Sequence, residues 1–345
     1  MSRMCIAVDD NMLAAALAVP EIKRQVSPSE TLRARAKRCQ VGNAPYPSWY
    51  LFGSKEKSLR GLVDCYTRQG VEVFLCPESK LTPSLDTDYI DTQFCTVEGP
   101  LYAAWAEQNL KVFGYLPETF SSKTFLAAAV KKHQGQRYLP NQATYTKDSR
   151  AILPHSHNTV WIVKTPYGAA GSNRNGSPYT VWQSEELEKQ LSSLLAALQD
   201  EEELICSEFV VTNDPYAQCA DHVVHKMPFI VSANAVAPYG VVCQKFIYHC
   251  NWSQLHERRK LSLGEFIGPP DITVGYIGSI EEFHAFVQVL AFHQQRRVML
   301  SVDFIIPPDG IPRYLESNKL AATFAEQFDP DLPSLIDFYA QLPLV

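Results

Sequence analysis

Two carboxylates, Asp303 and Glu316, are placed by their spacing on the two strands of one predicted β-hairpin. Between them lies Pro307-Pro308-Asp309-Gly310, a strong turn signal that separates two apolar runs. A turn centred between Asp309 and Gly310 sets Asp303 directly opposite Glu316, with both side chains on one face. Carboxylates in this position repel one another unless a cation lies between them. Such hard oxygen ligands suit Mg²⁺, so the pair predicts a magnesium site, with a solvent-facing pair of acids as the simpler alternative.

The remaining hairpin residues divide between the two faces by strand alternation. Asn318 falls on the face of the two carboxylates and adds an amide oxygen to the predicted ligand set. The opposite face is predicted to be apolar and to contact the core, with these members: Leu300, Val302, Phe304, Ile306 and Leu315.

A lysine followed by a glycine-rich loop is the second candidate feature. Residues 158–164 read as a strand that ends in Lys164, and residues 165–176 contain three glycines and several small residues. The N–H groups of such a loop can surround phosphates because no Cβ blocks their approach, and a lysine supplies a point charge. The Walker A pattern is absent. Taken alone, the loop is more often a simple turn, and a lysine at a strand end is more often solvated.

Two further segments complete the pattern. Lys123 falls in the first turn of a helix predicted from about residue 122, which Ser121 or Ser122 can cap. A lysine there opposes the helix dipole, so the local sequence offers no reason for it. Residues 203–211 read as a strand with an acidic hinge at Glu208-Phe209-Val210. In this order, Lys164 with its loop, the hinge and the acidic hairpin match what binding ATP with Mg²⁺ requires.

The elements that must position these residues indicate an α/β protein that becomes α+β toward its C-terminus. In residues 1–115, predicted strands at 46–53 and 71–76 flank a helix at 55–69, an order typical of a parallel βαβ unit. A leucine-striped helix begins at Ser184, two strands occupy 227–236 and 240–249, and Ser279-x-x-Glu282 begins another helix. The predicted divisions are 1–115, 116–200 and 201–345.

The bulk composition excludes several classes of protein. The chain has 345 residues, 46% hydrophobic and 20% charged, which suits two or three globular domains. A net charge of -6 without a long basic run argues against nucleic acid and anionic membranes as partners. No apolar stretch approaches a membrane span, and the N-terminus lacks a signal-peptide core. Nine cysteines without a CxxC pattern suit buried thiols, so a soluble cytoplasmic protein is expected.

Residues 115–325 resemble the ATP-grasp superfamily, in particular the carboxylate-amine ligases typified by D-alanine-D-alanine ligase. In that family the hairpin carries an aspartate, a glutamate thirteen residues later and an asparagine two residues further on. Asp303, Glu316 and Asn318 reproduce both spacings, and by this resemblance all three are Mg²⁺ ligands. The resemblance implies an ATP-grasp fold with an N-terminal parallel α/β domain, a central subdomain with the glycine-rich loop and a C-terminal subdomain with the metal hairpin.

The resemblance also implies roles for the nucleotide-binding segments. Lys123 and Lys164 correspond to the two nucleotide lysines of the family, with Lys164 also in a catalytic role. The loop that closes over the phosphates contains Gly168, Gly171 and Ser172. The backbone of Glu208, Phe209 and Val210 corresponds to the linker that contacts adenine, and Asp214 to a ribose contact.

One position departs from the family pattern. The family commonly places an arginine two residues before the metal aspartate, where it stabilises the tetrahedral intermediate, and here that residue is Ser301. Arg258 and Arg297 are the candidates for this catalytic role, with Lys245, Arg296 and Arg313 as alternatives. The residues after Asn318 also lack the family's usual Pro/Gly loop, so the acceptor is not expected to be D-alanine.

The activity implied by the resemblance is ATP-dependent ligation of a carboxylate to an amine through an acylphosphate. The substrates would be amino acids, small peptides or a specialised metabolite. Two alternatives remain open: an ATP-grasp-like kinase, which Ser301 favours because a kinase needs no arginine for a tetrahedral intermediate, and an ATP-binding module without chemistry. Related ligases are often dimers, which makes a homodimer compatible with the sequence without determining it.

Overall fold

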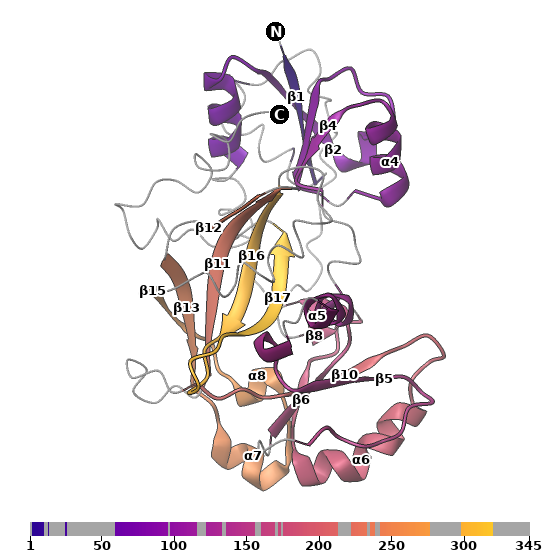
Figure 1. Ribbon diagram of the computed structural model, residues 1–345, viewed down its shortest axis with the longest axis vertical. Coiled ribbons are helices and arrows are strands. Elements are labelled where there is room, and N and C mark those ends of the chain that lie inside the picture. The colour runs from indigo at the N-terminus through magenta and orange to yellow at the C-terminus, as the bar shows by residue number, and fades with distance from the viewer. Residues whose placement is uncertain are drawn as a thin grey trace.

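The computed structural model describes residues 2–9, 13, 25, 59–95, 97–115, 122–132, 136–155, 160–169, 172–173, 175–212, 222–232, 235–238, 242–276 and 298–319. Over these residues, three sheets follow one another along the long axis of the molecule (Figure 1). The strand predicted at 46–53 and the helix predicted from Ser279 lie outside the described residues. Within them, no helix is long and apolar enough to cross a membrane.

The first sheet is parallel and has the order β2-β1-β3-β4. Its strands are β1 (Arg3–Val8), β2 (Glu72–Pro77), β3 (Tyr89–Phe94) and β4 (Lys111–Phe113). A helix over residues 59–68 and α4 (Gly99–Glu107) cover opposite faces (Figure 1), and a short 3-10 turn, η1 (Glu78–Lys80), follows β2. The predicted helix and its following strand are confirmed. β1, a short apolar run, was not predicted from the sequence.

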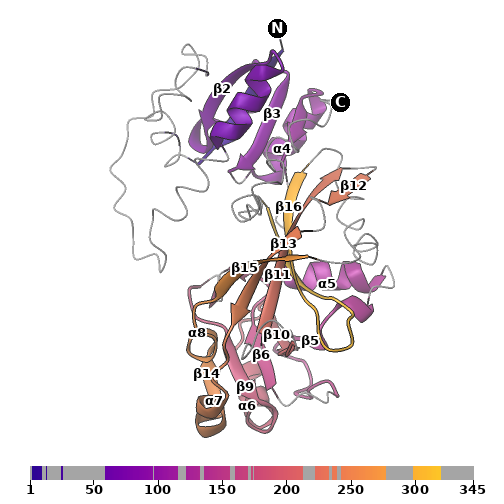
Figure 2. The same cartoon turned by 90° about the vertical axis from the view of Figure 1, so that its left-hand side faces the viewer.

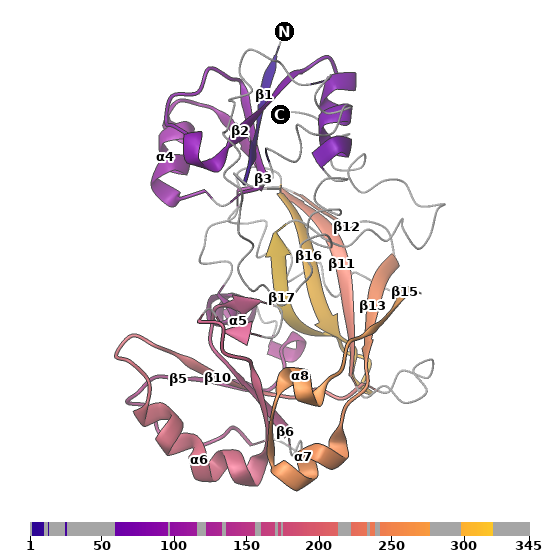
Figure 3. The ribbon, with the colours of Figure 1, turned by 180° about the vertical axis from the view of Figure 1, so that it is seen from behind.

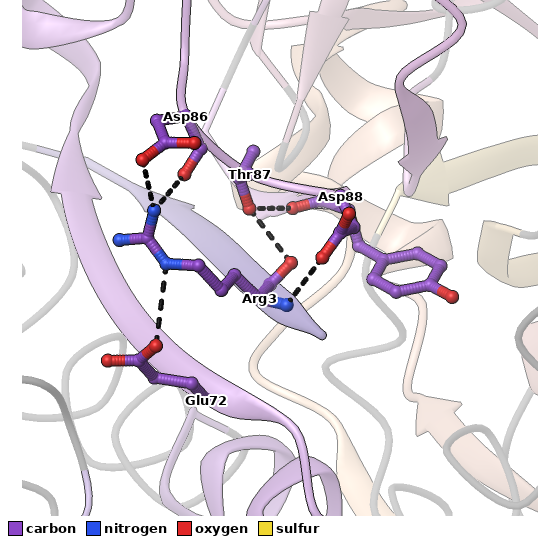
Figure 4. Close-up of polar contacts among 6 residues, drawn as sticks. Arg3, Glu72, Asp86, Thr87 and Asp88 are labelled. Atoms are coloured by element: carbon purple, nitrogen blue, oxygen red, sulfur yellow. Dashed lines mark hydrogen bonds and ion pairs between the residues drawn. The ribbon is translucent and has the colours of Figure 1, made fainter. Parts of the chain in front are cut away.

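The amino ends of the parallel strands are held together by Arg3 (Figure 4). Its guanidinium pairs with Glu72 at 3.4 Å and with Asp86 at 2.6 Å, and its N–H donates to Asp88 Oδ2 at 2.8 Å. The Thr87 hydroxyl donates to the Arg3 carbonyl at 2.9 Å. These contacts tie β1, β2 and the start of β3 at one edge. The opposite, carboxyl edge of the sheet is directed toward the six-stranded sheet (Figures 1 and 3).

The second sheet is antiparallel and has the order β14-β9-β6-β10-β5. Its strands are β5 (Gln142–Tyr145), β6 (Val160–Lys164), β9 (Thr180–Gln183), β10 (Leu204–Glu208) and β14 (Lys260–Ser262). The sheet therefore continues beyond the division predicted after residue 200, because β10 pairs with both β5 and β6. That boundary is corrected: hydrogen-bonded pairing, which the local pattern does not reveal, assigns β10 and β14 to the central sheet.

Helices cover this sheet and connect it to its neighbour (Figure 2). In α6 (Ser184–Ala196), Leu187, Leu191 and Leu195 are buried against the sheet, which confirms the predicted leucine stripe. α7 (Trp252–Arg258) and α8 (Leu263–Phe266) pack at its β14 end. α5 (Lys123–Lys132) is followed by the short η3 (Gln136–Tyr138) and lies between β17 and this sheet (Figures 1 and 3). Ser122 Oγ accepts from the Phe125 N–H at 3.3 Å, as a helix cap does.

The third sheet has the order β15-β13-β11-β16-β17, with β12 paired to β11. Its strands are β11 (His222–Ser232), β12 (Ala235–Pro238), β13 (Val242–Tyr248), β15 (Asp271–Tyr276), β16 (Val298–Ile305) and β17 (Arg313–Lys319). The predicted hairpin is confirmed as β16 and β17, and Asp303 pairs with Glu316.

An irregularity in this hairpin corrects one predicted contact. The register shifts between Asp303 and Phe304, so that Phe304 pairs with Tyr314 and not with Leu315. Leu315 was predicted on the face of Phe304. It packs instead against the cluster of Val210, Val224 and Ile305. A bulge adds one residue to one strand and changes the face beyond it, which a regular alternation cannot anticipate.

Candidate active site

The two hairpin carboxylates each lie against a lysine ammonium. Lys226 Nζ, from β11, is 2.7 Å from Asp303 Oδ2, and Lys123 Nζ, at the start of α5, is 3.1 Å from Glu316 Oε2. Asp303 is only 4% exposed, and β11 and β16 pair Lys226 directly with it. The repulsion expected between facing acids is therefore relieved by two ammonium groups contributed by other elements.

The donor set fits a hard divalent cation. The register sets Asn318 opposite Ser301, two rows from the Asp303–Glu316 pair; the Asn318 side chain is not among the described parts of the structure. Within the described residues, no three Cys, His, Asp or Glu side chains gather as a metal cluster. Two facing carboxylates match the way Mg²⁺ is bound when it shares its coordination sphere with water and substrate phosphates.

Lys123 and Lys164 are brought to the same place. Lys123 Nζ also donates to the Gly168 carbonyl at 3.0 Å. Burial alone would lower the pKa of Lys123, but the charges of Glu316 and Tyr179 raise it. Lys164, at the end of β6, is 8% exposed, and burial first and the Lys123 charge second lower its pKa to about 8. Lys123 lies at a helix start, where the helix dipole disfavours a cation, and its pairing with Glu316 of β17 compensates for this.

The glycine-rich loop is folded into a small ladder of β7 (Gly168–Ala169) and β8 (Ser172–Asn173). The Thr165 N–H and hydroxyl donate to Asn173 Oδ1 at 2.8 and 3.0 Å, which ties the loop to the end of β6. A Cβ on Gly168 would lie 2.3 Å from the Ser172 carbonyl oxygen, so only glycine fits there. Ser172 is half-buried, and Gly171 lies outside the described residues.

The side chains of the predicted linker are used inside the protein. Glu208 Oε1 accepts from the Asn141 N–H at 3.0 Å, and the Phe209 N–H donates to the Val160 carbonyl at 3.0 Å. The Val210 carbonyl accepts from His222 Nδ1 at 2.9 Å, since a carbonyl oxygen cannot donate. Burial lowers the pKa of His222 to about 4, so the ring is neutral with its proton on Nδ1. Within the linker, the Glu208 side chain, the Phe209 N–H and the Val210 carbonyl are therefore already bonded inside the protein.

An apolar surface lies beside the charged groups on the six-stranded sheet. Strand register places Glu316, Asp303 and Lys226 in one row across β17, β16 and β11. Two residues further along β11 and β16, the pair Val224 and Ile305 belongs to a buried apolar cluster. Its other members are Val210 and, packed against it, Phe246, Tyr248 and Leu315. The same face thus offers apolar contact near the linker and charge near the glycine loop.

The residues considered for the role of the missing arginine are not gathered here. Arg258 lies in α7, half exposed, and pairs with Glu265 at 2.9 Å. α7 is at the end of the molecule away from β16 and β17 in all three views (Figures 1, 2 and 3). Arg313 pairs with Asp309 in the hairpin turn, and Lys245 is paired in register with His225, one position away from the row of Lys226. Arg296, Arg297 and Asp214 lie outside the described residues.

Three residues at the site were not identified from the sequence: Lys226, Tyr179 and His222. Lys226 occurs in an ordinary β-strand, and only the pairing of β11 with β16 brings it to Asp303. Tyr179 follows the glycine loop and lies under Lys123, whose Nζ is 5.8 Å from the ring centroid. Nothing in the local sequence distinguishes them from residues of an ordinary strand, because their significance depends on contacts between sheets.

Comparison with known proteins supports the architecture. No protein-family profile and no curated protein matches the sequence. Among solved structures, D-cycloserine synthetase DcsG matches 99% of this chain and 98% of its own, with 10% identity and a TM-score of 0.52. A RimK domain ATP-grasp protein from Sphaerobacter thermophilus matches all of both chains, with 12% identity and a TM-score of 0.52.

A third similar structure is the ATP-grasp ligase PsnB with a phosphomimetic variant of its minimal precursor, Mg and ADP. It covers 99% of this chain and 97% of its own, with 10% identity and a TM-score of 0.50. At these identities the likeness shows the fold alone. It confirms the ATP-grasp fold that the resemblance in the sequence implied.

Proposed function

We propose that this chain, which has the ATP-grasp fold, is an ATP-dependent ligase that joins a carboxylate to an amine through an acylphosphate. The observation that carries the proposal is the pair of facing carboxylates, Asp303 and Glu316, each in contact with a lysine from a different element. With Lys164 nearby, three lysines meet two carboxylates, and the excess positive charge suits a polyphosphate ligand.

The proposed nucleotide position uses the apolar cluster near the linker and the charged side chains near the glycine loop. Adenine would lie against the apolar cluster, beside the linker. The triphosphate would extend toward Lys123, Lys164 and the loop around Gly168. Support for ATP and Mg²⁺ also comes from the PsnB structure, which contains Mg and ADP.

Mg²⁺ would be held by Asp303, Glu316 and Asn318, and when bound it would neutralise charge on phosphate oxygens. With their carboxylates occupied in this way, the ammonium groups of Lys123 and Lys226 would turn from them to phosphate oxygens. Lys226 is the proposed replacement for the cation missing at Ser301. It approaches Asp303 from the neighbouring strand, two rows away from Ser301.

The proposed reaction has two steps. A substrate carboxylate oxygen attacks the γ-phosphorus of ATP, and the bond to the bridging oxygen breaks to release ADP. The amine then attacks the acyl carbon, loses a proton, and phosphate leaves as the amide forms. The lysines orient and neutralise the phosphoryl group, and the loop at 165–176 closes to keep water from the acylphosphate.

The acceptor is proposed to lie between the hairpin and the parallel sheet. The carboxyl edge of that sheet is directed toward the six-stranded sheet (Figures 1 and 3). The strand order reverses at β1, with β2 on one side and β3 on the other, and ligands of open α/β sheets bind outside such a point. Amino acids, small peptides and specialised metabolites are the substrate classes to test.

The deciding experiment is Mg²⁺-dependent ATP turnover against pooled amino acids and small peptides, with phosphate release and product mass read together. Ligation predicts ADP, free phosphate and a product lighter than its summed substrates by one water. A phosphorylated product without free phosphate would assign a kinase instead. ATP binding without any substrate-stimulated turnover would support a binding module.

Glu316→Gln tests the role of the hairpin in the same assay. The amide keeps the size of the side chain but removes the charge that a cation requires, so turnover should fall below detection while the fold is retained. Asp200→Asn is the matched control, because Asp200 also pairs with a lysine, Lys147, at 3.0 Å but is 91% exposed. Full turnover in a folded Glu316→Gln variant would refute the metal role.

A further inference from the structure

The buried hydroxyl of Tyr179 has no hydrogen-bond acceptor in the described part of the chain. The other buried tyrosines there are all satisfied. Tyr66 donates to Asp91 at 2.9 Å, Tyr145 to the Ile152 carbonyl at 2.7 Å and Tyr314 to Ser317 at 3.2 Å, while Tyr138 accepts from Arg137. A buried hydroxyl without a partner destabilises the folded protein, so this exception calls for a cause.

The surroundings of the hydroxyl are those of the candidate site. Tyr179 is 5% exposed, and its hydroxyl lies 2.6 Å from where a Cβ on Gly168 would be. Burial raises the pKa of Tyr179, whereas the charge of Lys123 and a hydrogen bond with its ammonium lower it. An ammonium can only donate, so the phenol O–H still lacks an acceptor, and Lys123 itself also donates to the Gly168 carbonyl and pairs with Glu316.

The position of Tyr179 is set by its backbone. The residue stands between the glycine loop and β9, and its carbonyl accepts from the Leu263 N–H at 2.7 Å. The ring is therefore anchored to the central sheet while its hydroxyl is directed at the base of the loop. A group held in this way needs no rearrangement to meet a ligand, which reduces the entropic cost of binding.

We propose that the Tyr179 hydroxyl is a further phosphate-binding group, which donates a hydrogen bond to the polyphosphate chain of the bound nucleotide beside Lys123. The inference rests on the proposed function, since it requires a nucleotide at this site. A phosphate oxygen is an acceptor that the described protein does not provide there, and the adjacent ammonium groups attract it. The missing partner is thus part of the ligand.

The test uses Tyr179→Phe, with Tyr145→Phe as its matched control, and measures thermal unfolding without nucleotide and Mg-ATP affinity by calorimetry. Tyr179→Phe removes an unsatisfied hydroxyl, so the free protein should be at least as stable as wild type. Its affinity for Mg-ATP should fall roughly 10- to 100-fold, the loss of a hydrogen bond to a charged group. Tyr145→Phe removes a satisfied hydroxyl outside the site, so it should lower stability and leave affinity unchanged.

The opposite signs separate a ligand-binding role from a structural one. Equal affinity of wild type and Tyr179→Phe would overturn the assignment of Tyr179 while leaving the nucleotide site intact. A loss of stability in Tyr179→Phe as large as in Tyr145→Phe would also overturn it, because the hydroxyl would then have a partner within the protein. Absence of Mg-ATP binding by wild type would instead overturn the proposed function, and this inference with it.

Discussion

Replacing Lys164 with methionine should make the nucleotide-free protein more stable. The Lys164 ammonium is 8% exposed and lies near another cation, Lys123. A lysine pKa that falls from 10.5 to about 8 corresponds to about 3 kcal/mol of cost for the protonated form at pH 7. Methionine has a similar length and carries no charge, so Lys164→Met should gain roughly that amount.

The pH dependence of this gain gives a sharper test. The folded protein releases the Lys164 proton at lower pH than the unfolded chain, so the cost is complete below pH 8 and disappears as the pH rises toward 10.5. The stability difference between Lys164→Met and wild type should therefore be about 3 kcal/mol at pH 7 and below about 1 kcal/mol at pH 10. Groups that titrate in both proteins contribute equally to their stabilities, so their effect cancels when the stability of wild type is subtracted from that of Lys164→Met.

Urea unfolding of both proteins at these two pH values provides the measurement. The variant should at the same time lose Mg-ATP affinity, because the charge that costs stability is the one that meets the phosphates. A variant less stable than wild type at pH 7 would refute the reasoning, since Lys164 would then be a well-paired ammonium that stabilises the fold.

Two further substitutions test the loop and the hairpin. Gly168→Ala should lower stability by roughly 2 kcal/mol and Mg-ATP affinity by about tenfold or more, because the new Cβ meets the Ser172 carbonyl. Calorimetry and urea unfolding check this against Gly268→Ala, where a Cβ meets nothing within 4 Å, and equal behaviour would contradict it. Lys226→Met should cost roughly 3 kcal/mol by leaving Asp303 buried without its cation, and Mg²⁺ should restore part of it. A stability of this variant that does not respond to Mg²⁺ would argue against a cation site.

The sequence alone determined the features that depend on local spacing. The turn signal and strand alternation were sufficient to pair Asp303 with Glu316, because a tight turn sets the register of its hairpin. Helix periodicity predicted α5 and α6, and a serine cap predicted the start of α5, because both signals depend on residues close together in the sequence. The resemblance to the ATP-grasp superfamily, which the residues from Asp303 to Asn318 carry, implied the fold that the solved structures confirm.

The tertiary structure decided what depends on contacts between distant segments. Lys226 reaches Asp303 only through the pairing of β11 with β16, and β10 belongs to the central sheet only through its pairing with β5 and β6. The reason for Lys123 at a helix start lies in another sheet, at Glu316. Cross-strand partners and buried charges are properties of the packed chain. The alternation of apolar and polar residues along one strand shows which side chains share a face, but not which distant strand lies beside it.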